Sequence, residues 1–514
     1  MTTEALIAEL KEIYQEILDL EPLAEKISGT VHPDFGPSAR NLVRYLALRN
    51  HDLRQLHDPL SDLGLSSLRS AEGYVLTNLY RVLQLLHLLV GQPWPERKAP
   101  TIIGFEHSKS LIRKHSNLLF NRPPDFNTHE IMVTMPDKAA QDVELIVEMA
   151  KRGMTIARIN LSHGDEPLWL GMVQNIREAS RRSGKDLRIY MDLAGPKIRI
   201  KFPAPEGQAE KKVKALPMRE GRCLQLEKDP VAFDRFREAL KSPDIRTPIP
   251  VQISIPEIID ALKVGDRVFF DDGVIEAKVT GTDGETAVVQ VSKTFKSKLK
   301  ADKGMNLPQL AMELPSLTEK DRDTLPFIAR YADLLGYSFV QRKSDVRRLY
   351  ERLEELGDKK PGVIFKIENQ KAFNRLSHII LEGMKHNRIG VMIARGDLAV
   401  EIGFDRISEV QNEILLLCEA AHVPVIWATQ VLDNLAKKGI ATRAEISDAA
   451  LSVRSECVML NKGPYILEAI SELRTILNRM ESHSSKNKNA LRPLRIARKN
   501  LKRIKSLWQP ADTL

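Results

Sequence analysis

From Glu130 onward, short apolar runs of strand length alternate with amphipathic helical segments, and this rhythm constrains the fold more than any other feature of the chain. Such an alternation is typical of a parallel sheet whose faces are covered by helices. About eight units are present, which predicts the closed (β/α)8 arrangement of the α/β class, a TIM barrel. The predicted strands are Ile131–Thr134, Ile156–Ile159, Arg188–Met191, Ala332–Phe339, Gly362–Ile367, Ile389–Ile393, Val423–Trp427 and Cys457–Leu460.

The pattern changes between the third and fourth units. There, Asp266–Phe270, Val274–Val279 and Thr286–Val291 alternate with turns rich in Gly, Asp and Lys, which predicts antiparallel hairpins. We therefore expect a β-rich lid domain over residues 202–303, inserted into a catalytic barrel of residues 126–201 and 304–482. An insertion after a barrel strand lies at the catalytic face, where it can close over a ligand.

Helical periodicity runs from Met1 to about Gln92 without any chemical constellation, so we expect an N-terminal helical domain over residues 1–125 whose role cannot be read from the sequence. The first residues are acidic and amphipathic, unlike a secretory or transit signal. No apolar stretch reaches the roughly 20 residues that a bilayer span needs. These features predict a cytoplasmic protein.

The three cysteines, Cys223, Cys418 and Cys457, are widely spaced, which favours buried reduced thiols over disulfides or a zinc site.

The net positive charge is concentrated at the C-terminus. Lys and Arg number 77 against 68 Asp and Glu, a difference of nine, and the segment from Lys486 to Lys505 alone holds nine basic residues and no acidic one. A basic tail over residues 483–514 could contact nucleic acid or an anionic membrane. We favour a solvated, partly helical extension that packs its Leu and Ile residues on the body of the protein.

Polar residues gather at the carboxyl ends of five predicted strands. In a closed barrel these ends converge on one mouth. A single Asp or Lys at a strand end is more often an ion-pair partner or a cap than a catalyst, so the prediction depends on the five ends together. The residues are Arg158, Asn160, Ser162, His163, Asp192, Lys197, Arg199, Lys366, Glu368, Asn369, Arg395, Gly396, Asp397, Thr429 and Gln430.

The charges of this set favour metal-assisted phosphoryl chemistry. Glu368 and Asp397 supply two carboxylates, enough to hold a hard cation such as Mg2+ whose other ligands are water and substrate oxygens. Four cations could neutralise a phosphoryl group in transfer. They are Arg158, Arg199, Lys303 and Lys366. The sequence has neither a GxxxxGK[ST] loop nor the glycine loop of protein kinases, so a nucleotide would be held by another scaffold.

Seven motifs between about Glu130 and Tyr465 resemble, in order, those of the pyruvate kinase family. They are ARINLSHG (Ala157–Gly164), MDLAGPKIR (Met191–Arg199), FDDGVIEAKV (Phe270–Val279), KGMNLP (Lys303–Pro308), FKIEN (Phe365–Asn369), MIARGDLAVE (Met392–Glu401), and WATQVLDNL with TRAEISDAA (Trp427–Leu435 and Thr442–Ala450). Single motifs can arise by chance, but seven in one order indicate kinship.

The resemblance implies that phosphoenolpyruvate and ADP react to give pyruvate and ATP, a step of glycolysis. The implied catalytic residues are Lys366 as principal electrophile, Arg158, and Thr429 near the enolate that is protonated. The implied substrate contacts are Arg158, Lys366, Gly396, Asp397 and Thr429, and the implied nucleotide contacts are Asn160, His163, Arg199 and Lys303. The implied Mg2+ ligands are Glu368 and Asp397, with Mn2+ as an alternative ion. We also expect a homo-oligomer.

Family members commonly bind K+, and the resemblance carries this site onto Asn160, Ser162, Asp192 and the carbonyl of Leu193. Many K+-dependent members have Glu at the position that matches Lys197. An ammonium group on Lys197 could occupy the site in place of the ion. The resulting hypothesis is that K+ is dispensable.

The chain departs from the family pattern in four ways. The first loop, in IMVTMPDKAA (Ile131–Ala140), lacks the usual Arg, and LNKGPYI (Leu460–Ile466) replaces the SGETA stretch that is expected after the last strand. The helical N-terminal domain is extra. We expect no C-terminal regulatory domain and hence no regulation by sugar phosphates bound there. Two alternatives stay open: a phosphoenolpyruvate-binding enzyme with another acceptor, and a catalytically impaired metabolite sensor.

Overall fold

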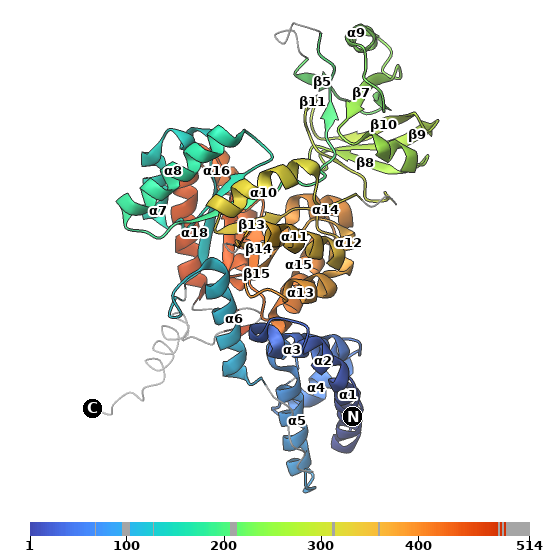
Figure 1. Cartoon of the computed structure of the whole chain (residues 1–514). Helices are drawn as coiled ribbons and strands as arrows, with labels where there is room; N and C mark the ends of the chain where they lie inside the picture. Colours follow the sequence, from blue (N-terminus) through green and yellow to red (C-terminus); the bar gives the residue numbers. More distant parts are fainter. Residues whose placement is uncertain are drawn as a thin grey trace, which may run out of the picture.

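Eight parallel strands close into a barrel, as the strand and helix alternation predicted (Figure 1). The computed structural model describes residues 1–66, 68–94, 103–126, 128–205, 213–310, 314–357 and 360–481, and the backbone of residues 484–485 and 488–489. Around the barrel the order is β1-β17-β16-β15-β14-β13-β3-β2. The strands are β1 (Glu130–Thr134), β2 (Ile156–Asn160), β3 (Arg188–Asp192), β13 (Leu334–Tyr337), β14 (Gly362–Ile367), β15 (Ile389–Ala394), β16 (Val425–Ala428) and β17 (Cys457–Leu460).

Helices cover the outside of the barrel, and local signals set their ends. In α7 the Asp142 side chain accepts the Leu145 N–H at the start, and Gly153, with a φ of 119°, ends the helix. These elements are η3 (Asp137–Ala140), α7 (Val143–Arg152), α8 (Glu166–Ser183), α10 (Glu319–Tyr331), α11 (Lys343–Glu355), α12 (Gln370–Asn374), α13 (Leu376–Gly383), α14 (Arg395–Ile402), α15 (Ile407–Ala420), α16 (Asp433–Lys438), α17 (Arg443–Leu451), η6 (Ser452–Arg454) and α18 (Ile466–Glu481).

The chain leaves the barrel after β3 and builds a lid with its own hydrophobic core. Its main sheet has the order β12-β8-β9-β10-β6-β7-β4, and a second pair joins β5 to β11. The predicted hairpins are confirmed, since β8, β9 and β10 pair antiparallel. The lid elements are β4 (Ile200–Lys201), β5 (Ala215–Pro217), β6 (Cys223–Glu227), α9 (Phe233–Lys241), β7 (Ile249–Ile253), η5 (Pro256–Ala261), β8 (Arg267–Phe270), β9 (Ile275–Thr282), β10 (Thr286–Thr294), β11 (Lys298–Lys300) and β12 (Met305–Asn306).

The N-terminal helices lie at the end of the barrel opposite the lid (Figure 1). Their buried side chains form one continuous core with the residues between the barrel and its helices. The elements are α1 (Thr3–Asp19), α2 (Glu21–Ser28), η1 (Pro33–Phe35), α3 (Gly36–Leu48), α4 (Arg54–Asp62), η2 (Glu72–Tyr74), α5 (Val75–Leu89) and α6 (Phe105–Phe120).

Helix α6 closes the amino-terminal end of the barrel. Leu119 and Phe120 at its end belong to the cluster inside the barrel. Glycines at the starts of two strands make room for this, since a β-carbon on Gly362 or Gly390 would lie 2.9 or 2.6 Å from a Leu119 methyl. Arg388 Nη2 donates to the Leu119 carbonyl at 3.1 Å, one of the last carbonyls of the helix, which have no partner within it.

The three cysteines are buried and free, as predicted. The predicted basic tail lies almost wholly outside the described residues, apart from a hairpin of β18 (Ser484–Ser485) and β19 (Lys488–Asn489). Within the part of the chain that the structure describes, no helix combines the length and apolarity needed to cross a bilayer.

Candidate active site

A cavity of about 380 Å3 opens between the carboxyl ends of the barrel strands and the lid. Eleven of the residues that the sequence singled out line it, from four strand ends, the segment that enters the lid, and the lid itself. They are Arg158, Asn160, Ser162, His163, Leu193, Lys197, Arg199, Lys303, Lys366, Glu368 and Asp397. The predicted convergence on one mouth therefore holds for these residues.

Lys366, on β14, lies among acidic groups at the base of the cavity. Its Nζ is 3.0 Å from Glu368 Oε1 and 3.6 Å from Asp192 Oδ1, and it donates to the Ser338 hydroxyl at 2.8 Å. Burial alone would lower the pKa of Lys366, but the charges of Asp192 and Glu368 raise it above its ordinary value. The side chain is therefore a fixed cation at neutral pH.

Glu368 and Asp397 share the cavity and repel each other electrostatically. Burial raises the pKa of Glu368, and the charge of Asp397 raises it further. For Asp397, burial is outweighed by Lys197, whose Nζ lies 2.9 and 3.1 Å from the two carboxylate oxygens, so the pKa of Asp397 is lowered. Two close carboxylates of this kind are a setting in which a divalent cation would be stabilised.

The donor set fits Mg2+ with few protein ligands. Among the described residues, no group of three or more His, Cys, Asp and Glu side chains could enclose a metal. An ion at Glu368 and Asp397 would take its remaining ligands from water and substrate oxygens, which is how Mg2+ is usually bound.

Three of the four groups predicted to hold K+ make hydrogen bonds within the protein: Asn160, Asp192 and the Leu193 carbonyl. Asp192 accepts from Arg158 Nε and from the Tyr190 hydroxyl, each at 2.5 Å. The Leu193 carbonyl accepts from the Ser338 hydroxyl at 2.7 Å, and the Asn160 side chain accepts the backbone N–H of Ser162 at 3.1 Å.

The Lys197 ammonium donates to Asp397, one of the two predicted metal ligands. Besides its two contacts with Asp397, it is 3.6 Å from Asp272 of the lid. From the sequence, we expected the Lys197 ammonium to lie among the K+ ligands, in place of the ion. The reason for the difference is that Lys197 lies beyond β3, in the segment entering the lid, and its side chain reaches across the mouth to the end of β15.

The lid and the segment that enters it supply further cations to this cavity. Lys303 Nζ pairs with Asp271 Oδ1 at 2.6 Å, and Arg199 Nη1 donates to the Asp302 carbonyl at 2.9 Å. Burial would raise the pKa of Asp271, but Lys303 and Lys296 lower it. Arg199 lies in the segment that enters the lid, and Lys303 lies between the lid strands β11 and β12, so any motion of the lid carries both cations.

Gly396 and Thr429 lie beside the cavity, outside the set of residues that line it. The Gly396 N–H donates to Thr429 Oγ1 at 2.9 Å. Thr429 has a φ of 64°, a left-handed conformation that costs a β-branched residue about 1–3 kcal/mol. Arg395 holds this turn by donating to the carbonyls of Ala428 at 2.9 Å and Thr429 at 2.5 Å.

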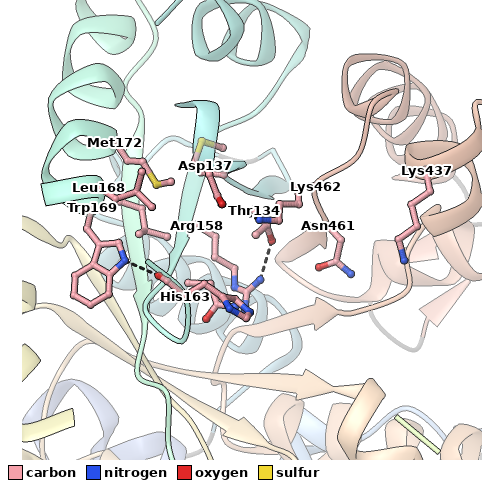
Figure 2. Close-up of a pocket in the computed structure, with 13 residues that line it drawn as sticks. Thr134, Asp137, Arg158, His163, Leu168, Trp169, Met172, Lys437, Asn461 and Lys462 are labelled. Atoms are coloured by element: carbon pink, nitrogen blue, oxygen red, sulfur yellow. Dashed lines mark hydrogen bonds and ion pairs between the residues drawn. The ribbon is translucent and has the colours of Figure 1, made fainter. Parts of the chain in front are cut away.

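A second cavity of about 250 Å3 adjoins the first and shares Arg158, Asn160 and His163 with it. Figure 2 shows an apolar wall on one side and a polar wall on the other. The apolar wall contains Leu168, Trp169 and Met172, and the polar wall contains Asp137, Asn461, Lys462 and Lys437. Lys462 Nζ pairs with Asp137 at 3.0 Å, so the two loops that depart from the family pattern meet here.

The family model "Pyruvate kinase, barrel domain" matches residues 126–470. The chain belongs to the pyruvate kinase family. The pyruvate kinases of Bacillus licheniformis and Geobacillus stearothermophilus are each 33% identical to it over 350 residues, which is 67% of this chain and 55% of theirs. The crystal structure of a pyruvate kinase from Cryptosporidium parvum matches with a TM-score of 0.58 and 27% identity, covering 69% of each chain. The chain thus spans about half the length of the curated relatives it matches.

Some residues at this pyruvate kinase-type site were not singled out from the sequence. Ser338 follows β13 directly, and the strand-end rule would have found it had the strand been taken to end at Tyr337. Asn306 and Glu401 lie inside two of the quoted family motifs but received no role. Asn306 Nδ2 donates to Asp397 Oδ1 at 3.2 Å, a contact that no local pattern announces.

Proposed function

We propose that the protein is a pyruvate kinase, which transfers the phosphoryl group of phosphoenolpyruvate to ADP and yields pyruvate and ATP. The observation that carries the proposal is the meeting of Lys366, Glu368 and Asp397 in one cavity. Phosphoryl transfer brings several negative charges into a small volume, and fixed cations stabilise that charge in the transition state.

In this proposal, Glu368 and Asp397 hold Mg2+, or Mn2+, which would polarise the phosphoryl oxygens. Lys366 and Arg158 bind the transferring phosphoryl group. The Gly396 backbone and Thr429 orient the carboxylate end of the substrate, with Thr429 close to the enolate carbon. Closure of the lid excludes water from the cavity.

The acceptor nucleotide would lie across both cavities. Asn160 and His163 line the two cavities together, so the phosphates would meet Arg199 and Lys303 in the larger one while the base extends into the smaller. The Trp169 indole donates to the His163 carbonyl at 2.8 Å and holds this loop in place. Burial and then Arg199 lower the pKa of His163, so its neutral ring would contact the nucleotide.

The decisive test is a lactate-dehydrogenase-coupled assay with phosphoenolpyruvate, ADP and Mg2+. Lys366→Met should lower turnover by about 100-fold or more, because it removes a preorganised charge. Lys151→Met is the matched control, since Lys151 lies on the outside of α7 and pairs there with Glu148. Wild-type protein that binds phosphoenolpyruvate without turnover would contradict the proposal.

A second candidate keeps the phosphoenolpyruvate site but uses another acceptor. The observation that favours it is the Asp137 and Lys462 pair, which joins the two altered loops on the nucleotide side. Turnover with a different phosphoryl acceptor, in the absence of turnover with ADP, would support this candidate.

We also propose that K+ is dispensable. Asp192 already has Arg158, Tyr190 and Lys366 around it, and the Lys197 ammonium supplies a fixed positive charge in the same cavity. Replacing K+ by tetramethylammonium should leave turnover within about twofold, well under 1 kcal/mol of barrier. A collapse of turnover in that buffer would contradict the proposal.

Family membership further supports the proposal of a cytoplasmic homo-oligomer. Light scattering after size-exclusion chromatography would give a mass that is a multiple of 58.1 kDa. A monomeric mass would contradict it.

A further inference from the structure

The lid contributes a buried polar side chain, Asn306, that is not among the proposed substrate, nucleotide or metal contacts. Asn306, on β12, is only 5% exposed, and its Nδ2 donates to Asp397 Oδ1 at 3.2 Å. Its position is set by the lid, because Asn306 pairs with Phe269 of β8 in the lid sheet. A lid residue therefore touches a predicted metal ligand of the barrel directly.

The same amide group reaches a second carboxylate. Asn306 Nδ2 lies 3.5 Å from Glu401 Oε1. Glu401 follows Asp397 by four residues in α14, and residues at that spacing share one face of a helix. The Asn306 amide nitrogen therefore contacts two acidic side chains on one face of α14. These two acceptors fix the orientation of the amide group.

The amide oxygen of Asn306 has no hydrogen-bond partner among the described residues. Asn306 Oδ1 is buried, and no described group donates a hydrogen bond to it. A buried acceptor left unsatisfied costs about 1–3 kcal/mol, so a donor is expected at this point. Water molecules on Mg2+ are such donors, because the ion gives up its hydration shell reluctantly.

We propose that Asn306 is a positioning residue of the metal site: Nδ2 orients Asp397, and Oδ1 accepts a hydrogen bond from a water molecule of the bound ion. Glu401 keeps the amide in this orientation. The inference rests on the proposed binding of Mg2+ at Glu368 and Asp397. Its consequence is that metal binding and docking of the lid stabilise each other.

The first test measures Mn2+ binding by electron paramagnetic resonance, which needs no catalytic turnover. Asn306→Leu should weaken binding by about 10- to 100-fold, the usual effect of losing a residue that orients a metal ligand. Glu401→Leu should weaken it too, whereas Glu401→Gln keeps an acceptor oxygen and should stay within about threefold of wild type. Gln225→Leu, in β6 of the same lid sheet, is the control and should bind as wild type does.

Hydrogen exchange then tests the coupling to the lid. In wild type, Mg2+ should slow exchange in residues 267–273 and 303–308, and Asn306→Leu should abolish that effect. A residue that merely supports the lid would change exchange equally with and without the ion. That result, or an unchanged Mn2+ affinity in Asn306→Leu, would overturn the inference.

Glu368→Gln separates this inference from the proposed function. If Glu368→Gln weakens Mn2+ binding and Asn306→Leu does not, the metal site stands and the role of Asn306 is wrong. If wild type binds no Mn2+, or Glu368→Gln binds it as wild type does, the proposed metal site fails and the inference fails with it. Should Asn306→Leu not fold, the Glu401→Leu and Glu401→Gln pair decides the question.

Discussion

Gly336 lies on β13 directly against the side chains of Tyr190 and Asp192. It pairs with Asp192 between β13 and β3, and a β-carbon on it would collide with the Tyr190 hydroxyl and the Asp192 carboxylate. Only glycine leaves room there for the buried hydrogen bonds around Asp192, because interiors are close-packed and relax little. The arrangement beneath Lys366 therefore depends on a residue that has no side chain.

Gly336→Ala should lower the free energy of unfolding by about 1–3 kcal/mol, the cost of overpacking a filled interior. Urea denaturation followed by circular dichroism measures this. Gly281→Ala is the matched control: Gly281 also lies in a strand, but its β-carbon would meet open space, so the change should stay within about 0.5 kcal/mol. Equal effects of the two substitutions would contradict the prediction.

Glu401 should make stability depend on pH. Burial, and then the charge of Asp397, raise the pKa of Glu401 from 4.5 to about 7. Because the folded-state pKa is the higher one, the contribution is complete below pH 4.5 and is lost as the pH rises through about 7, a change of ~3 kcal/mol.

Glu401→Gln removes this titration. In metal-free buffer the variant should therefore gain stability relative to wild type as the pH rises from 5 to 8, measured by urea denaturation at each pH. The control is Glu238→Gln on the exposed face of α9. A stability difference between Glu401→Gln and wild type that does not change with pH would refute the prediction.

At the residue level, strand-end reasoning found the charged groups of the site because the barrel brings every strand end to one mouth. Lys366, Glu368 and Arg158 could be predicted in this way. Asn306 and Glu401 could not, since one lies in a lid strand and the other one turn inside a helix. Their meeting depends on how the lid docks, which no local pattern encodes.

Among the elements, α6 was the least predictable in its role. The helical periodicity was traced only to about Gln92, so the sequence predicted no helix here, and an apolar helical face does not reveal which partner it packs against. The sequence placed α6 in a separate domain. In the structure, its last turn fills the end of the barrel, between the starts of β14 and β15.

Leu119→Ala should therefore lower the free energy of unfolding by about 2–5 kcal/mol, because Leu119 is fully buried at the base of the barrel and its loss leaves a cavity. Thermal and urea denaturation would measure the change. Leu88→Ala, on a residue that is 68% exposed in α5, is the control and should change stability by less than about 0.5 kcal/mol. Similar costs for both would show that α6 does not pack as described.

For the whole molecule, the distribution of hydrophobic cores predicts how it unfolds. The N-terminal helices and the shell of the barrel share one core, whereas the lid has its own. Cooperative units follow contiguous cores. The overall architecture could be predicted from the sequence because strands and helices have clearly different hydrophobic periods. The hydrophobic core shared by the helical domain and the barrel could not be predicted, because it arises from contacts between residues distant in sequence.

Hydrogen exchange at increasing urea should show the N-terminal helices and the barrel losing protection together, with the lid losing it at a lower concentration. The physical reason is that the lid core is the smaller one and is joined to the barrel by two chain segments only. Protection of α1, α3 and α5 that vanishes well before that of β14 would contradict this prediction.

The Leu119 side chain packs between Gly362 and Gly390, at the amino-terminal ends of β14 and β15. Strand β14 ends at Ile367, directly before Glu368, and β15 ends at Ala394, three residues before Asp397. Helix α6 thus packs against the amino-terminal ends of the two strands whose carboxyl-terminal ends lead to the proposed metal carboxylates.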